Sequence, residues 1–115
     1  MKAISLKEPW ASLVMNGKKT IETRVWQTKY RGKLLICASA IPKSEVSGNA
    51  IAVANLVDCR PMTKADERQA CCAVYDGAYS WVLNKVKPIT PFKVKGRLRL
   101  FNVTVPGKIR SKMQR

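Results

Sequence analysis

A short stretch near the N-terminus carries side chains that could bind or act on a ligand. It contains Gly17, Lys19, Glu22, Arg24 and Trp26. A carboxylate can hydrogen-bond the edge of a nucleobase or activate a water molecule, and the two cations can bind a phosphate or a developing negative charge. The same three charges could instead form an ordinary salt bridge that fastens a helix to a strand. Both interpretations stay open at this point.

Residues 21–26 alternate between uncharged side chains and the members of this group, and that period predicts a strand. On such a strand Glu22, Arg24 and Trp26 share one face, with the Cα atoms of Glu22 and Arg24 about 6.5 to 7 Å apart. If this face lines a cleft, the Trp26 ring could stack on a nucleobase, a contact worth about 1 to 3 kcal/mol per base. Trp10 and Trp81 lie in apolar patterns, so we interpret both as core residues.

A second group of cations occurs near the C-terminus. Every second residue is a cation through Lys93, Lys95, Arg97 and Arg99. The alternation predicts a strand over residues 92–100 with four charges on one face, about 6.5 to 7 Å apart and close to the phosphate repeat of a single nucleic-acid strand. A solvated edge strand protected by charge would give the same pattern. We interpret the stripe as phosphate-binding, because no acidic residue lies between the cations to relieve their repulsion.

The rest of the sequence predicts the strands and helices that must position these charged and aromatic side chains. Strands are expected at residues 3–6, 33–38, 50–59 and 79–83, and short helices between Pro9 and Gly17 and at about residues 63–74. Pro88 and Pro91 predict an extended or turning connection. This set indicates an α+β domain built on a small mixed β-barrel with two short helices at its side. We expect a domain over residues 1–105 and a loose basic tail over residues 106–115.

The excess of basic over acidic residues indicates which class of molecule the chain binds. The 115 residues include 22 Lys and Arg but 7 Asp and Glu, a formal net charge of +15. Such a field attracts polyanions, so nucleic acid, above all RNA, is the expected partner. No basic amphipathic helix suited to a membrane surface is evident, and neither is a signal peptide or an apolar run of about 20 residues. We expect a soluble, unprocessed, cytoplasmic protein with no membrane partner; protein partners stay open.

Two absences exclude further chemistry. The chain has no histidine, which removes histidine-based ribonuclease mechanisms and His-containing zinc sites. The four cysteines, at 37, 59, 71 and 72, contain no C-x-x-C pair, so we expect small buried thiols and no metal or cofactor. No phosphate-binding glycine loop of the nucleoside triphosphatases occurs, which argues against triphosphate hydrolysis.

The pattern G-x-K-x-x-E-x-R, placed just after a helix that opens with Glu8, Pro9 and Trp10, resembles the ASCH domain of the PUA-like superfamily. The resemblance extends from Ile4 to Phe101. It implies a barrel of about six strands, with a cleft lined by the motif residues. It also implies an RNA-binding or RNA-associated module, in which Lys19, Glu22, Arg24, Trp26 and the basic stripe would contact the nucleic acid.

The resemblance also implies an alternative. One branch of small bacterial ASCH proteins hydrolyses the acetyl amide of N4-acetylcytidine, and ribonuclease activity is ascribed to other members. In an enzyme of this kind Lys19 and Glu22 would be catalytic, but Glu22 stands where that branch carries a threonine. The branch's further carboxylate would come from the second helix, where Asp66 and Glu67 are candidates. A third interpretation is a protein-interaction module that meets an acidic partner.

Overall fold

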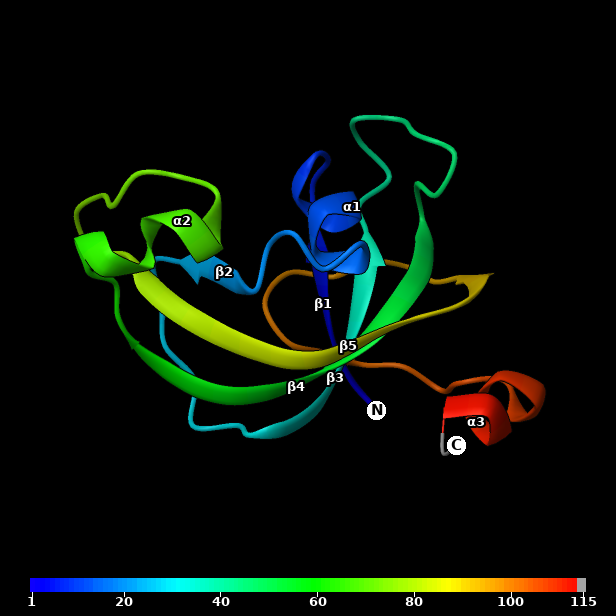
Figure 1. Cartoon of the computed structure of the whole chain (residues 1–115). Helices are drawn as coiled ribbons and strands as arrows, with labels where there is room; N and C mark the ends of the chain where they lie inside the picture. Colours follow the sequence, from blue (N-terminus) through cyan, green and yellow to red (C-terminus); the bar gives the residue numbers. More distant parts are fainter. Residues whose placement is uncertain (114–115) are drawn as a thin grey trace.

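Six strands form one strongly curved sheet in the computed structural model of the chain, which describes residues 1–113 (Figure 1). The strand order is β2-β5-β4-β3-β1-β6. β1 pairs with β3 in parallel, and the other neighbours are antiparallel. The strands are β1 (Lys2–Leu6), β2 (Ile21–Arg24), β3 (Gly32–Ala38), β4 (Asn49–Pro61), β5 (Tyr79–Lys93) and β6 (Phe101–Asn102).

The sheet is buried on both faces around β3, as the nearly continuous apolar run there predicts. Leu34 and Ile36 belong to a cluster that includes Ala11 and Val14 of the first helix. Leu35 and Cys37 belong to a second cluster, together with Phe101 and the C-terminal Met113. The expected strands at residues 3–6, 33–38, 50–59 and 79–83 all lie within observed strands.

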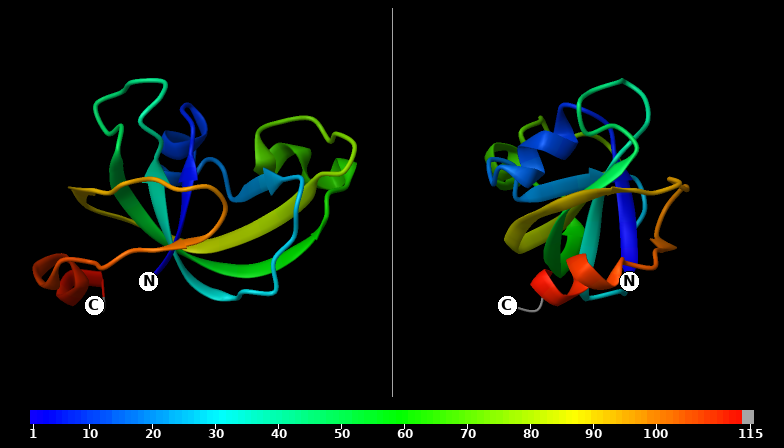
Figure 2. Two further views of the ribbon diagram at one scale, coloured as in Figure 1. Left: turned by 180° about the vertical axis from the view of Figure 1, so that it is seen from behind. Right: turned by 90° about the vertical axis from the view of Figure 1, so that its right-hand side faces the viewer.

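Short helices lie at two ends of the molecule. α1 (Trp10–Met15) and α2 (Glu67–Ala70), which follows the 3-10 turn η1 (Lys64–Asp66), lie on one side; α3 (Gly107–Met113) lies at the opposite end (Figures 1 and 2). The predicted start of the second helix is confirmed by a capping box between Thr63 and Asp66. This helix ends earlier than predicted, because Cys71 adopts a left-handed conformation with φ of 58°.

The sheet does not close into a barrel, so that part of the predicted architecture is wrong. β2 and β6 remain its two edges, and they are short strands of 4 and 2 residues. A backbone ladder between them would be needed for closure. Instead the Arg24 side chain reaches across and donates from Nη2 to the backbone oxygen of Ser5 on β1, 2.8 Å away. The α+β class and the helices beside the sheet are confirmed.

The predicted strand over residues 92–100 is also wrong. β5 continues through Pro88 and Pro91 to Lys93, alongside β4, and the two prolines are accommodated where the register of this pair shifts repeatedly. The chain then leaves the sheet over residues 94–100, a segment we call the strap. Arg99 has a φ of 61°, which interrupts any extended run there. The alternation therefore reflects no shared strand face.

The C-terminal segment, expected to be loose, forms helix α3. Ile109 and Met113 are four residues apart and therefore face the same side. Both pack into the second apolar cluster, and Met113 retains 8% of its exposure. Packing of this apolar pair explains why the basic segment is ordered; the last two predicted tail residues, including Arg115, lie outside the described residues. No helix within residues 1–113 is long and apolar enough to cross a lipid bilayer.

Candidate nucleic-acid interface

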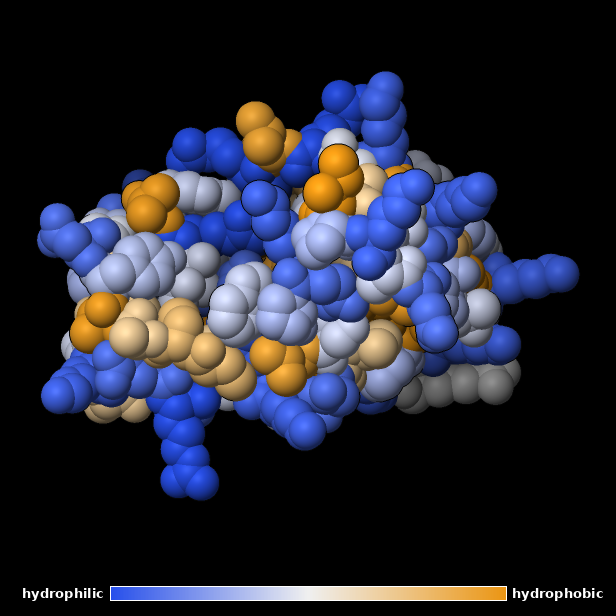
Figure 3. Space-filling model, turned by 90° about the horizontal axis from the view of Figure 1, so that it is seen from above, coloured by the Kyte–Doolittle hydropathy of each residue, from blue (hydrophilic) through white to orange (hydrophobic). Residues whose placement is uncertain are grey.

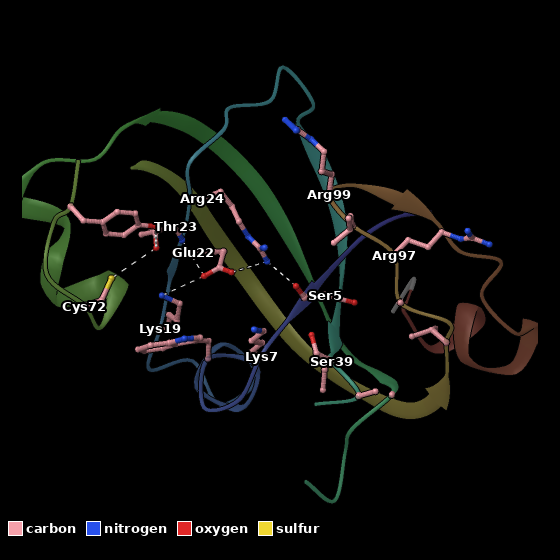
Figure 4. A pocket seen from close by; sticks show the side chains of 18 residues that line it. Ser5, Lys7, Lys19, Glu22, Thr23, Arg24, Ser39, Cys72, Arg97 and Arg99 are labelled. Atoms are coloured by element: carbon pink, nitrogen blue, oxygen red, sulfur yellow. Dashed lines mark hydrogen bonds and ion pairs between the residues drawn. The ribbon is translucent and has the colours of Figure 1, made fainter. Parts of the chain in front are cut away.

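A cleft of about 720 Å³ opens between α1, β2, the loop after α2 and the strap (Figure 4). Lys19, Glu22 and Arg24 line its floor together with Ser5 of β1 and Trp10 of α1. The strap contributes further residues on the side away from α2. The motif residues expected near one another are therefore brought together in one cleft.

Glu22 lies between two cations and is 8% exposed. Its Oε1 atom is 3.6 Å from Lys19 Nζ and accepts a hydrogen bond of 3.0 Å from the backbone N–H of Thr23. Its Oε2 atom is 3.0 Å from Arg24 Nη2. Both carboxylate oxygens thus have partners that fix the orientation of the group before any ligand enters.

Lys19 is almost fully buried, with 1% exposure, although it is a lysine. Its ammonium group donates to the backbone oxygen of Ala70 at the end of α2 and lies 5.0 Å from the centroid of the Trp10 ring. A buried ammonium needs such partners, because desolvation of an unpaired charge costs several kcal/mol. Lys19 therefore connects α1, β2 and α2 around the cleft.

Arg24 provides the third charge of the floor. Its Nη2 atom serves both Glu22 and the Ser5 backbone oxygen, while its Nε atom is buried and has no hydrogen-bond partner among residues 1–113. The Ser5 hydroxyl oxygen is in the same position, buried and without a partner in that part of the chain. Two unsatisfied polar atoms thus belong to residues that line one cleft. Each costs about 1 to 3 kcal/mol unless a partner is supplied.

Tyr75, Thr23 and Cys72 form one end of the cleft, which the sequence pattern does not predict. Tyr75 donates from its hydroxyl to Thr23 Oγ1 at 3.0 Å, and the Cys72 sulfur lies 4.0 Å from the same Thr23 oxygen. Tyr75 is 42% exposed, so its ring is available to a ligand. The strand alternation grouped Glu22 and Arg24 on one face of β2, whereas Thr23 belongs to the other face. No sequence motif occurs in the loop after α2. No signal in the sequence would have singled out this tyrosine.

The structure does not place Trp26 in the cleft. β2 ends at Arg24, so the alternation does not continue to residue 26. The Trp26 ring packs edge-on against Trp81, with centroids 4.7 Å apart at 83°, and the Trp26 backbone oxygen accepts from Trp81 Nε1 at 3.2 Å. Trp81 is a core residue, as interpreted from sequence. Trp10, interpreted as core, is half-buried and lines the cleft instead.

The four cations of the basic stripe separate in space. Arg97 and Arg99 line the cleft from the strap, whereas Lys93 and Lys95 do not. Arg99 places its guanidinium 4.4 Å from the centroid of the Trp26 ring. Arg97 makes no hydrogen bond or ion pair with the residues that the structure describes, and in Figure 4 its side chain extends away from Glu22. The stripe therefore contributes two cations to the cleft.

The two carboxylates considered for the second helix lie elsewhere. Asp66 accepts from Arg60 at 2.7 Å, Ser80 at 2.9 Å and the Thr63 N–H at 3.1 Å, and Glu67 accepts from the Val74 N–H. Burial of Asp66 by itself raises its pKa, but the hydrogen bonds from Thr63 and Ser80 and the Arg60 charge outweigh it and lower the pKa overall. Among the residues that line the cleft, Glu22 is the one carboxylate.

The cysteines form no cluster. Cys37 is buried, and that burial raises the pKa of its thiol to about 12. Cys59, Cys71 and Cys72 are free and half-buried, so the expectation of buried thiols holds fully for one of four. Within residues 1–113, no group of three or more cysteine, histidine or carboxylate side chains converges as a metal site would require.

A family model for the ASCH domain matches residues 4–93, which include every element of the cleft except the strap. The chain belongs to the ASCH domain family. The fold agrees with the crystal structure of ASCH from Zymomonas mobilis, with a TM-score of 0.71 and 19% identity over 98% of this chain and 92% of that chain. A single-substitution variant of the same protein gives a TM-score of 0.70 at 19% identity, with 98% and 95% coverage.

Two mammalian proteins are similar over a short region. Activating signal cointegrator 1 from Homo sapiens is 49% identical over 37 residues, and its counterpart from Mus musculus is 47% identical over 36 residues. These matches cover 32% and 31% of this ASCH chain and 6% of each relative. The strap and α3 lie beyond the part of this ASCH chain that the family model matches.

Proposed function

We propose that this ASCH domain is an RNA-binding module that takes a nucleotide of single-stranded or structured RNA into the cleft. In this proposal the Glu22 carboxylate accepts hydrogen bonds from the edge of the base, and Lys19 and Arg24 hold that carboxylate in place. Tyr75 and Trp10 offer aromatic faces for stacking, in the role first expected for Trp26.

The observation that carries the proposal is the strap arginine at the edge of the cleft. Arg97 is exposed, and its guanidinium has no partner in residues 1–113, whereas Lys19 and Arg24 are committed to Glu22. An unpaired guanidinium beside a polar, aromatic-lined cleft is suited to a phosphate, because its planar donors match phosphate oxygens. The net charge of +15 extends the same preference to the rest of an RNA chain.

Binding is favoured over hydrolysis by the state of the carboxylate. A general base needs a carboxylate oxygen within hydrogen-bond reach of the proton that it removes. Both oxygens of Glu22 already have partners, and neither Asp66 nor Glu67 enters the cleft as a second carboxylate. Hydrolysis of a modified nucleoside or of an RNA phosphodiester is therefore the alternative function, and assays of turnover distinguish it from binding.

The direct test is binding of a fluorescent oligouridylate of about three nucleotides, short enough to report on one cleft. Arg97→Gln removes the free guanidinium, and Arg68→Gln, an exposed cation on α2 that does not line the cleft, is the matched control. One lost phosphate contact should weaken binding about fivefold at 0.1 M salt, since each contact contributes about 0.7 to the log-log salt slope. The control should bind as the unmodified protein does.

Two results would overturn the proposal. The first is no measurable RNA binding at low salt, or equal affinity of the Arg97→Gln and Arg68→Gln variants. The second is displacement of bound oligouridylate by polyglutamate as effectively as by unlabelled RNA, which would favour a module for acidic proteins. Since Arg97 has no partner within the described residues, the substitution should leave folding intact, and circular dichroism checks this.

A further inference from the structure

The C-terminal third of the chain carries an unbalanced charge. Residues 77–115 contain ten lysines and arginines and no aspartate or glutamate. Three of these cations, Lys108, Arg110 and Lys112, lie on α3, which is outside the range that the family model matches. The basic residues of this helix therefore lie outside the segment that carries the G-x-K-x-x-E-x-R motif and the family-model match.

α3 is a fixed surface and not a loose tail. Ile109 and Met113 anchor it in the apolar cluster that contains Phe101 and Val105. The helix begins on Pro106, whose carbonyl oxygen accepts hydrogen bonds from the N–H groups of Ile109 and Arg110 at 3.0 and 2.9 Å. Because Ile109 and Met113 face the core, helical geometry places Lys108 and Lys112 on one flank of α3 and Arg110 on the other, and all three are exposed.

The cations of α3 have no partner within the described chain. Lys108, Arg110 and Lys112 are all exposed, and none of the three side chains makes a hydrogen bond or ion pair with residues 1–113. Lys108 and Lys112 are four residues apart on one helix, an arrangement of like charges that is itself unfavourable. The fold thus holds two neighbouring lysines and a third cation, Arg110, on the surface of one short helix, and a bound polyanion would neutralise their charge.

The position of α3 relates it to the cleft. It lies at the opposite end of the molecule from α1 and α2 (Figures 1 and 2). The chain reaches α3 from the strap, which lines the cleft, by way of β6 and residues 103–106. Gly96 passes directly over β1, where an added Cβ would lie 3.0 Å from Ser5 Oγ. In Figure 4, Arg97 extends toward the side of the view on which α3 lies. Arg97 therefore extends from the cleft toward the side of the molecule on which α3 lies.

We propose that α3 is a second phosphate-binding surface for the same RNA strand, so that a nucleotide held in the cleft is followed by backbone that crosses the strap and binds Lys108, Arg110 and Lys112. This inference rests on the proposed function of the cleft. Single-stranded RNA fits because its phosphates repeat along the strand and need no defined sequence. A membrane surface does not fit, because the apolar side of α3 is already buried in the core. On the opposite side of the molecule, apolar groups are scattered among hydrophilic ones (Figure 3).

The inference predicts that α3 matters for long RNA and not for short RNA. We compare oligouridylates of about three and about twelve nucleotides, which bracket the site sizes of single-strand binding folds. The test variant is Lys108→Gln, Arg110→Gln and Lys112→Gln together, since glutamine keeps the helix propensity. The matched control replaces three exposed cations outside α3 and the cleft by glutamine: Lys29, Lys33 and Lys64.

For the longer RNA, loss of three phosphate contacts should reduce the log-log salt slope by about 2 and weaken binding about 100-fold at 0.1 M salt. The shorter RNA should bind the α3 variant within about twofold of the unmodified protein, and the control triple should affect the two lengths alike. Arg97→Gln, by contrast, should weaken both lengths.

The outcomes separate the two proposals. If the α3 variant and the control triple bind the longer RNA equally well, α3 is not a phosphate-binding surface, and the cleft proposal stands. If no RNA of either length binds the unmodified protein, both proposals fail. If polyglutamate protects α3 lysines from acetylation and the longer RNA does not, the surface fits an acidic protein and the RNA assignment is overturned.

Discussion

Arg24 and Ser5 join two distant strands of the sheet through one hydrogen bond of 2.8 Å. Arg24 ends β2, the first strand in sheet order, and Ser5 lies on β1, the fifth. The same Arg24 nitrogen is 3.0 Å from Glu22. The motif that forms the floor of the cleft therefore also holds the curled sheet together where no backbone ladder does.

Arg24→Gln tests this double role. The substitution removes the reach to the Ser5 carbonyl and one partner of Glu22, so we expect the free energy of unfolding to fall by about 1 to 3 kcal/mol. Urea denaturation measures the change, with Arg68→Gln as a control for the loss of an exposed arginine. A change below about 0.5 kcal/mol, the usual range for surface substitutions, would show that the sheet curls without this contact.

Trp26→Ala should destabilise the protein, in contrast with the expectation for a cleft residue. The substitution removes an edge-on contact with Trp81 and the stacking of Arg99, and it opens a space beside the core. We expect a loss of about 2 to 4 kcal/mol in the free energy of unfolding. Trp26→Phe keeps an aromatic edge and should lose less. A Trp26→Ala protein with unchanged stability and weakened RNA binding would restore the original stacking role.

Two of the four cations of the basic stripe should contribute to RNA binding in the cleft, and the other two should not. Arg97 and Arg99 line the cleft, so replacing both by glutamine should flatten the salt slope for a short oligouridylate by about 1.4, or 0.7 for each phosphate contact. Replacing Lys93 and Lys95, which lie outside the cleft, should leave that slope nearly unchanged. Equal effects of the two double variants would indicate a continuous phosphate-binding stripe, as the alternation in sequence suggested.

Asp66 should make stability sensitive to acid. Its pKa is lowered in the folded protein, so its stabilising contribution is complete above the unfolded value of about 3.9 and is lost as the pH falls through the lower folded value. Asp66→Asn should cost about 1 to 3 kcal/mol at pH 7, and the difference from the unmodified protein should shrink below about pH 4. Asp76→Asn, at an exposed carboxylate, is the control. A difference that is constant with pH would contradict this linkage.

The hydrolase alternative has a direct assay. Chromatography of the cytidine released from N4-acetylcytidine measures the turnover. We expect little or none, because Glu22 is engaged by two cations and a backbone N–H. Glu22→Gln should therefore change ligand selectivity more than any rate. Turnover of about 1 per second or faster that is abolished by Glu22→Gln would establish an enzyme.

Local patterns predicted the parts of this fold that depend on local physics. The apolar run of β3 and the capping residues Thr63 and Asp66 predicted a buried strand and a helix start, and both are confirmed. Closure of the sheet depends instead on how far β2 and β6 extend, which is set by contacts between distant segments. The prediction of a strand over residues 92–100 was wrong for a related reason. Its residues alternate with the period of a strand, but Arg99 takes a left-handed conformation that the pattern does not reveal.

The same distinction applies to the site. Lys19, Glu22 and Arg24 are close in sequence, so their spacing was sufficient to group them. Tyr75 reaches the cleft from a loop some fifty residues away through its contact with Thr23, a separation of 52 residues. Such a contact leaves no periodic signal in a single sequence. Helix α3 was overlooked because its two apolar anchors, Ile109 and Met113, are too few to produce a clear helical period.

The buried Lys19 has a consequence for how this motif should be read in other chains. Its ammonium group holds the end of α2, the Trp10 ring and the Glu22 carboxylate together from a position with 1% exposure. A descendant that no longer met any ligand would still lose stability if it lost this lysine, so selection for folding alone favours retention of Lys19. Retention of Lys19 in a related protein is thus weak evidence of activity, whereas loss of an unanchored residue such as Arg97 would report directly on what the cleft has ceased to bind.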